Sequence, residues 1–218
     1  MNRRSFVIST AVVGIALFSG GAILYNAVQP PPVAGTAAVG DSLIRPHSPS
    51  FGRADAPVTI VEFFDPSCEA CRAFYPVVKQ IMAATGDDVR LVLRYTPLHQ
   101  GSDEAVRILE AARKQDKFQP VLEAMLANQP EWAVHGAPDL DKAWQIAAGG
   151  GIDLETARRD AKMPEVDAVL AQDVADVTAN NVQQTPTFFV NGKPLQEFSP
   201  QGLYDLVKKE LEASKAGS

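Results

Sequence analysis

The spacing of apolar residues along the chain predicts where its strands and helices lie. Apolar runs at 58–64 and 89–95 predict two strands, and in the second run every other side chain from Val89 to Tyr95 is apolar. Between the two runs, apolar residues recur at helical spacing and predict a helix over 67–84. Because one helix connects the two strands, we expect a parallel pair joined by a right-handed crossover.

A long helical block follows the second strand. Helical spacing continues from about 102 to 181. The later elements, in order, are a strand at 187–190, a hairpin turn at Asn191-Gly192, a return strand at 193–195 and an amphipathic helix at 200–213. The whole order, βαβ, helical block, then ββα, predicts the α/β class with one mixed central sheet.

The N-terminal segment, residues 1–28, has a different pattern. Two arginines near its start are followed by no charged residue until Asp41, and Phe6–Tyr25 is predominantly apolar. A helix of about 20 such residues would span about 30 Å of hydrocarbon. The pattern also describes a secretory signal peptide with small residues at 19–22 for cleavage, and the arginine pair faintly resembles a twin-arginine signal. We expect an inner-membrane anchor or a cleaved signal, and in both cases export of the remainder.

Composition divides the rest of the chain into a linker and a folded domain. Residues 29–50 are rich in Pro, Gly and Ser and poor in apolar side chains, so they predict a linker. The folded domain is expected at 51–218, with the helical insertion at about 102–181 between its two halves. With 20 basic and 26 acidic side chains, the chain has a formal charge of −6 and no basic patch interleaved with aromatic residues. We therefore expect no nucleic-acid partner.

The two cysteines of the chain, Cys68 and Cys71, form a C-x-x-C motif between the first predicted strand and helix. The first thiol therefore lies at a helix N-terminus, where unpaired N–H groups and the helix dipole favour a thiolate. Two thiols one helical turn apart can close a disulfide and exchange it with other thiols. The alternatives are a purely structural disulfide and a zinc site, but zinc needs about four ligands and the three histidines are scattered. Outside the cytosol disulfides persist, so we favour redox use.

The strand, C-x-x-C and helix, followed by Thr-Pro-Thr-Phe-Phe-Val-Asn-Gly at 185–192, resemble the thioredoxin superfamily. The length and place of the helical insertion resemble its DsbA-like exported thiol–disulfide oxidoreductases, over roughly residues 52–214. The resemblance implies the thioredoxin fold. It also implies that Cys68 is the attacking thiol and that Cys71 resolves the mixed disulfides formed at Cys68.

Two further site residues follow from the resemblance. Pro186 matches the family's cis-proline, which packs against the disulfide, whereas the alternative is an ordinary trans proline at the start of a strand. The backbone of Thr185 would then offer hydrogen bonds to an extended polypeptide. Strong oxidants in the family often carry an apolar residue at this position, while isomerase and reductase relatives often carry Thr.

Glu62 interrupts an apolar strand six residues before Cys68. A buried carboxylate without a partner costs several kcal/mol or shifts its pKa upward. In the family, an acid at this spacing lies beneath the disulfide and helps move the proton of the resolving cysteine. We expect this role for Glu62, with simple exposure at a strand edge as the alternative.

Glu69 and Ala70 separate the cysteines, where strong oxidants of the family carry a Pro-His pair. We therefore expect no imidazolium beside the thiolate, and Glu69 adds a negative charge there. The pair should be a moderate oxidant or a reductant. Elsewhere, Trp132 and Trp144 are expected in the core in preference to a peptide groove, and His99 in a loop without a catalytic role.

These features predict a thiol–disulfide oxidoreductase on the periplasmic side of the inner membrane, either anchored there or secreted. The resemblance implies cysteine-containing exported polypeptides as substrates and a membrane or periplasmic redox partner that resets the pair. No cofactor is expected, because the cysteines themselves carry the electrons. A copper(I) carrier that uses both thiols as soft ligands is the alternative from another class of function.

Overall fold

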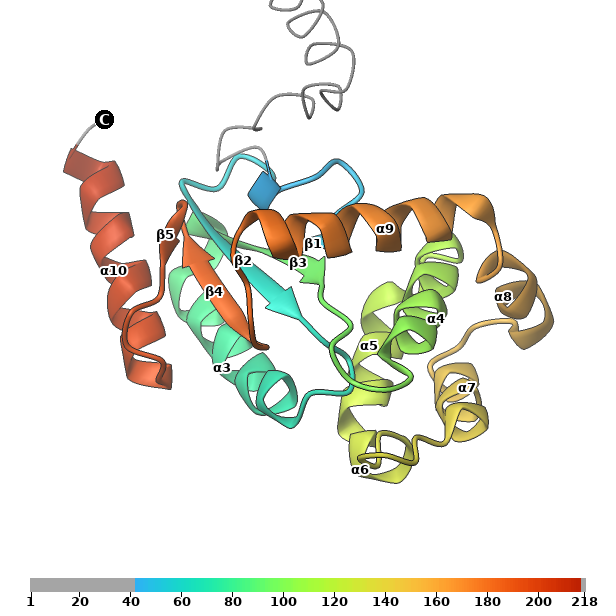
Figure 1. Ribbon diagram of the computed structural model, residues 1–218. Coiled ribbons are helices and arrows are strands. Elements are labelled where there is room, and N and C mark those ends of the chain that lie inside the picture. Colours follow the sequence, from blue (N-terminus) through green and yellow to red (C-terminus); the bar gives the residue numbers. More distant parts are fainter. Residues whose placement is uncertain (1–41, 217–218) are drawn as a thin grey trace, which may run out of the picture. The chain divides into compact units, whose positions relative to one another are not determined.

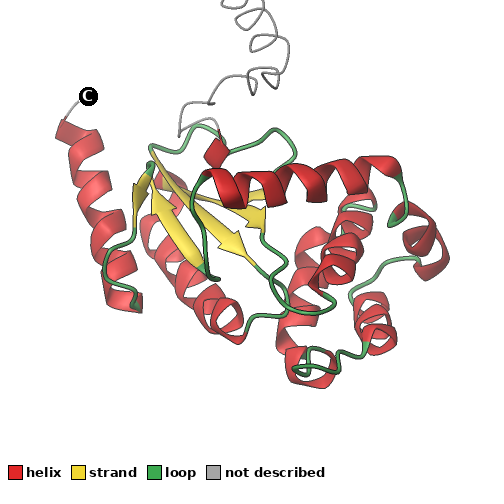
Figure 2. Ribbon diagram, in the orientation of Figure 1, coloured by secondary structure: helices red, strands yellow, loops and turns green. Residues whose placement is uncertain are grey.

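The structure is a computed structural model that describes residues 42–216 of the chain. Within those residues, the strands form one mixed five-stranded sheet in the order β1-β3-β2-β4-β5 (Figure 1). Helices cover the sheet and extend from one end of it as a separate helical block (Figure 2). The predicted α/β class and mixed sheet are confirmed.

The centre of the sheet is a parallel pair, β2 (Val58–Phe64) and β3 (Val89–Tyr95), with the bounds predicted from sequence. Helix α3 (Glu69–Thr85) and a 3-10 turn, η1 (Gly86–Asp88), connect the two strands. All seven residues of β2 are buried, which explains its nearly continuous apolar sequence. The end of β2 therefore directs the chain straight into the loop that carries the cysteines.

The second half of the domain adds antiparallel strands. β4 (Thr187–Val190) pairs with β2, and β5 (Lys193–Pro194) pairs with β4. The turn between them has φ of 48° at Asn191 and 79° at Gly192, a region that these residue types tolerate. Helix α10 (Pro200–Ala216) closes the described chain and contacts α3, β2 and β4.

The predicted helical block is present as six helices within the described chain. They are α4 (Ser102–Lys114), α5 (Phe118–Ala127), α6 (Gln129–Trp132), α7 (Leu140–Gly149), α8 (Leu154–Asp160) and α9 (Pro164–Ala179). α4 contacts α5, α7, α8 and α9, so it forms the centre of the block. The long α9 returns the chain to the sheet, where it contacts β3 (Figure 1).

The two faces of the sheet contribute to two apolar clusters. The larger cluster contains both cysteines and joins α3, α10 and the helical block. The smaller one lies on the face of Val61 and Phe63 and includes Leu43 and Val182. Alternation along β2 directs Glu62 and Phe64 away from Val61 and Phe63, toward the face that carries the cysteines.

The segment at 42–50, which the sequence analysis assigned to the linker, lies against the domain. Leu43 is 3% exposed, and β1 (Ser50–Phe51) adds an antiparallel strand beside β3. The linker prediction, which rested on composition, is wrong for these residues. Polar contacts hold the segment against the domain, because its two basic side chains lie against buried acids. Arg45 pairs with Asp176 at 2.7 Å, and His47 Nε2 lies 2.7 Å from Asp173 Oδ1.

The same two acids surround a buried arginine. Arg94, in β3, is fully buried, and its guanidinium lies 2.7 Å from Asp173 and 2.6 Å from Asp176. We call Arg94, Asp173, Asp176, Arg45 and His47 the Arg94 cluster. Because each carboxylate faces a guanidinium, the negative charges of this cluster are compensated inside the fold.

The predicted N-terminal anchor or signal, residues 1–28, lies outside the described residues. Across residues 42–216, no helix combines the length and apolar character needed to cross a bilayer.

Candidate functional site

The two cysteines lie where the sheet meets the first turn of α3. Cys68 is the N-cap of α3, with extended backbone angles (φ −79°, ψ 122°), and Cys71 lies one turn into the helix. Both are free thiols, 6% and 0% exposed. Gln129, from α6, holds the loop before α3 by donating hydrogen bonds to the carbonyl oxygens of Pro66 and Cys68 at 2.8 and 3.0 Å. The helical block thus fixes the position of the attacking thiol predicted from sequence.

The surroundings of Cys68 favour its thiolate. A hydrogen bond from the Cys71 thiol lowers the pKa of Cys68 to about 5, despite the opposing effect of burial. The side chain of Thr185 and the backbone N–H groups of Cys71 and Ala70 act in the same direction. These donors at the helix N-terminus are the physical source of the activation expected for a C-x-x-C motif.

Cys71 has the opposite character. Its burial raises the pKa of its thiol far above the ordinary range, and the hydrogen bond to Cys68 and the charge of Glu62 add to the effect. The two thiols therefore differ strongly in acidity, and only Cys68 is a thiolate at neutral pH. This asymmetry is what separate attacking and resolving roles require.

Glu62 lies in the middle of β2 with 1% of its surface exposed. Neither of its carboxyl oxygens has a hydrogen-bond partner among the described residues. Burial raises the pKa of Glu62 to about 8, and the charge of Cys68 contributes. The alternative of an exposed acid at a strand edge is therefore wrong. The proton-relay role stays a prediction, although a pKa near neutrality suits it.

The second sequence motif approaches the thiols from the other side. The Thr185–Pro186 peptide bond is cis, as the resemblance implied. The Cys68 thiol donates a hydrogen bond to the carbonyl oxygen of Thr185 at 3.2 Å. The Thr185 hydroxyl is buried and has no partner in this thiol form, so it is available as a donor when Cys68 ionises. Thr185 is thus in contact with the Cys68 sulfur, and the cis-proline follows it directly.

Two imidazole side chains lie at the start of α3, which the sequence analysis, expecting no imidazolium beside the thiolate, did not anticipate. His135, from the loop between α6 and α7, lies 3.1 Å from Glu69 Oε1. Its ring centroid is 5.6 Å from that of His99, which comes from the loop after β3. The sequence argument considered only Glu69 and Ala70 between the cysteines, but two distant loops bring their histidines to the start of α3.

Asp65 is the residue of this site that the sequence analysis missed. It follows β2 directly, is fully buried and lies 2.7 Å from His99 Nδ1. The available signal was an acid at the end of a buried strand, three residues before the first cysteine. We call Asp65, His99, His135 and Glu69 the Asp65 cluster.

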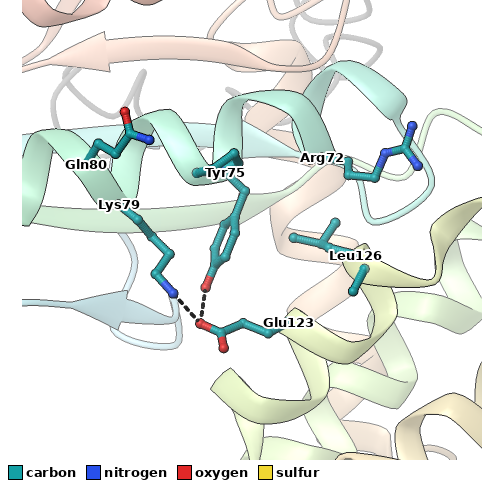
Figure 3. Close-up of a pocket in the computed structure, with 8 residues that line it drawn as sticks. Arg72, Tyr75, Lys79, Gln80, Glu123 and Leu126 are labelled. Atoms are coloured by element: carbon teal, nitrogen blue, oxygen red, sulfur yellow. Dashed lines mark hydrogen bonds and ion pairs between the residues drawn. The ribbon is translucent and has the colours of Figure 1, made fainter.

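A groove of about 510 Å³ lies on another side of α3, and its lining includes Arg72, Tyr75, Lys79 and Glu123 (Figure 3). The Tyr75 hydroxyl and Lys79 Nζ both donate hydrogen bonds to Glu123 Oε1, at 3.1 and 2.8 Å. None of the predicted site residues lines this groove. The groove is therefore separate from the residues that the sequence analysis assigned to the site.

The two tryptophans belong to the core. Trp132 is 0% and Trp144 is 3% exposed, so neither lines a peptide groove. The Trp132 indole N–H donates to the carbonyl of Met125 at 2.9 Å, and that of Trp144 donates to Glu104 at 3.0 Å. Both satisfy their polar atoms inside the helical block.

No group of three or more potential metal-ligating side chains occurs among the described residues. The two thiols are therefore the soft ligands available at this site for a metal such as copper(I).

Comparison with known proteins agrees with this geometry. The sequence profile of the thioredoxin family matches residues 45–209. A solved thioredoxin-like oxidoreductase from Silicibacter pomeroyi DSS-3 is 31% identical, with a TM-score of 0.68 over 82% of this chain and 98% of its own. BdbD from Bacillus subtilis is 26% identical, with a TM-score of 0.67 over 76% of this chain and 93% of its own.

Sequence relatives include much longer proteins. An Na(+)/H(+) antiporter NhaA of Herminiimonas arsenicoxydans is 34% identical over 169 residues, which are 77% of this chain and 25% of that protein. The chain thus spans about a quarter of the length of such relatives. At 16% identity, Wolbachia pipientis alpha-DsbA1 shares the fold with a TM-score of 0.70, over 80% of this chain and 96% of its own. The chain belongs to the thioredoxin superfamily, and it shares its fold with DsbA-like proteins.

Proposed function

We propose that this chain is an exported thiol–disulfide oxidoreductase that exchanges disulfides with the cysteines of other exported proteins. One observation carries the proposal. Cys68, at the N-terminus of α3, has a pKa of about 5, while burial keeps Cys71, one turn away, protonated. The likeness to an oxidoreductase of known structure at 31% identity supports the same activity.

In the oxidising direction, a substrate thiolate attacks the Cys68 sulfur of the Cys68–Cys71 disulfide. The bond between the two cysteines breaks, and Cys71 leaves with the electron pair and takes a proton. A second substrate thiolate then attacks the substrate sulfur of the mixed disulfide and releases Cys68 as a thiolate. Two electrons have passed from the substrate to the cysteine pair, and the reverse sequence reduces a substrate disulfide.

We assign to Glu62 the exchange of the Cys71 proton. Glu62 is fully buried, its charge raises the pKa of Cys71, and the charge of Cys68 raises the pKa of Glu62 itself. With a pKa of about 8, it can give a proton to the departing Cys71 thiolate and regain it from solvent. No other titratable carboxyl group of the described site is both buried and without a hydrogen-bond partner.

The substrate would bind as an extended polypeptide beside Thr185. Its backbone pairs with the segment before β4, and its cysteine meets Cys68 where the Thr185 carbonyl already contacts the thiol at 3.2 Å. The proposed position of the domain outside the inner membrane rests on the apolar N-terminal segment. The chain also matches part of proteins named Na(+)/H(+) antiporters, and this match supports a location of the domain beside a membrane.

Trapping variants test the proposal. A Cys71→Ala protein should accumulate mixed disulfides with a disulfide-containing test protein. The Cys68 thiolate attacks that disulfide, one sulfur of the test protein leaves as a thiolate, and Cys71 is absent to resolve the product. The matched Cys68→Ala protein should trap nothing. Trapping by Cys68→Ala alone would contradict the assigned roles.

A parallel titration separates oxidoreductase from copper carrier. Wild-type protein should equilibrate with a glutathione redox buffer and turn over a protein disulfide. Tight copper(I) binding by a protein that fails to exchange disulfides would instead support the carrier.

A further inference from the structure

Asp65 is surrounded by hydrogen-bond donors. It accepts hydrogen bonds from the backbone N–H groups of Ser67, Leu98 and His99 at 2.8, 2.8 and 3.0 Å. The Ser102 hydroxyl donates at 2.6 Å, and His99 Nδ1 lies at 2.7 Å. Five donors leave no place for a proton on the carboxyl group, so the geometry is that of a carboxylate. His99 Nδ1 must then carry a hydrogen, and Nε2 is the atom that gains or loses a proton.

The charge of Asp65 has one cationic partner. Among the ion pairs of residues 42–216, none joins Asp65 to Lys or Arg, and His99 is its sole basic neighbour. A buried carboxylate favours a charged partner that is also hydrogen-bonded to it. This arrangement favours the imidazolium form of His99.

The His99 ring also faces groups from other elements. Ser67, the residue before Cys68, lines the same cleft as His99. The charges of Cys68 and Glu69, at the N-terminus of α3, both act on the ring. From the loop between α6 and α7, His135 meets it at an interplanar angle of 76°. A cleft of about 60 Å³ lined in part by His99 and His135 has room for a few water molecules. Solvent protons can therefore reach the ring.

The direction of the pKa shift agrees with this geometry. Partial burial lowers the pKa of His99, but the hydrogen bond and charge of Asp65, with the charges of Cys68 and Glu69, outweigh it and raise the pKa. Coupling between two titrating groups is reciprocal. If the Cys68 thiolate stabilises protonated His99, protonated His99 stabilises the thiolate by the same free energy.

We propose that His99, held by Asp65, supplies the cation that stabilises the Cys68 thiolate, so that the Cys68–Cys71 disulfide loses oxidising power when His99 loses its proton. A disulfide oxidises more strongly when its reduced form is stabilised, and the thiolate is part of that form. The inference rests on the thiol exchange proposed above. In this proposal the imidazolium comes from His99, in the loop after β3, because no histidine lies between the two cysteines.

The test is a pair of matched substitutions in the full chain. His99→Gln removes the charge beside Cys68. His47→Gln removes the histidine that lies 2.7 Å from Asp173, a buried acid outside the thiol site. The titration of the thiolate by ultraviolet absorbance and the equilibrium constant with glutathione at pH 6 and pH 9 are measured for both.

His99→Gln should raise the pKa of Cys68 and shift the glutathione equilibrium several-fold toward the disulfide at pH 6, with a much smaller shift at pH 9. His47→Gln should change neither. Unchanged values in His99→Gln at pH 6, or equal shifts in the two variants, would overturn the proposal.

A second measurement needs no substitution. The His99 imidazole is titrated by NMR in the reduced and the oxidised protein, and its pKa should be higher in the reduced form, where the thiolate is present. Equal pKa values in the two forms would overturn the coupling. If the protein failed to equilibrate with glutathione, the proposed function would fail, whereas the thiolate and imidazole titrations would still report on His99.

Discussion

Two histidine–aspartate pairs with the same separation lie in different parts of this domain. His99 and His47 each lie 2.7 Å from a fully buried carboxylate, Asp65 and Asp173 respectively. Asp173 also has Arg94 at 2.7 Å, with a second carboxylate, Asp176, at 2.6 Å from the same guanidinium. Asp65 has backbone and hydroxyl donors in place of an arginine.

The difference shows how one motif can serve stability or reactivity. In the Arg94 cluster the carboxylates are paired with guanidinium groups that keep their charge at all physiological pH values. In the Asp65 cluster the balancing cation is an imidazole, which changes charge in that range. The first arrangement holds the segment at 42–50 against the sheet, and the second lies beside the reactive thiols.

The largest effect is expected in the Arg94 cluster. Arg94→Met leaves Asp173 and Asp176 buried with one cationic neighbour fewer, which should cost about 3–5 kcal/mol of unfolding free energy. The pKa of Cys68 should stay the same. Urea unfolding and thiolate absorbance measure the two quantities. A loss below about 1 kcal/mol would mean that water or rearrangement compensates the acids.

Glu62 extends the comparison to a buried carboxyl group with no cation at all. Its pKa is about 8 in the folded chain and has its ordinary value of 4.5 in the unfolded chain. Between these two pH values the folded state keeps a proton that the unfolded state has released. The contribution of Glu62 to wild-type stability should therefore fall as pH rises from about 4.5 to 8, by roughly 3 kcal/mol at pH 7.

Glu62→Gln should remove this part of the pH dependence. The free energy of unfolding of the variant should therefore increase relative to that of the wild type as pH rises. It should also slow the resolution of mixed disulfides. Unfolding measured at pH 5 and pH 7.5 provides the check. Parallel stability curves for the two proteins would rule out the raised pKa.

The smallest effect is expected at the exposed end of the Asp65 cluster. Glu69 and His135 are 60% and 66% exposed, so solvent weakens their influence on Cys68. Glu69→Ala should lower the pKa of Cys68 by less than about one unit, and His135→Ala should raise it. Both shifts should shrink at high salt. Shifts of the same sign in the two variants would contradict a charge effect.

The sequence predicted the backbone of this domain well. The bounds of β2 and β3 could be predicted because an apolar run bounded by turn residues has few alternatives in a parallel sheet. The positions of Cys68, Cys71 and Pro186 also followed, because local order and the resemblance to a family place them. Such features depend on short stretches of chain.

The parts that could not be predicted depend on contacts between distant segments. His99 and His135 meet through two loops separated by α4, α5 and α6, and nothing near either residue indicates the other. The two ends of the His47–Asp173 pair are 126 residues apart, so the segment at 42–50 had the composition of a linker. Polar pairs of this kind leave no periodic pattern in the sequence.

The rate of alkylation of each thiol against pH tests the central claim most directly. Reduced protein is treated briefly with iodoacetamide across the pH range, and the labelled cysteine is identified by peptide mass spectrometry. Labelling of Cys68 should reach half its maximal rate near pH 5, and Cys71 should stay unlabelled at neutral pH. A midpoint near the ordinary cysteine value of about 8.5, or equal labelling of both thiols, would contradict the account.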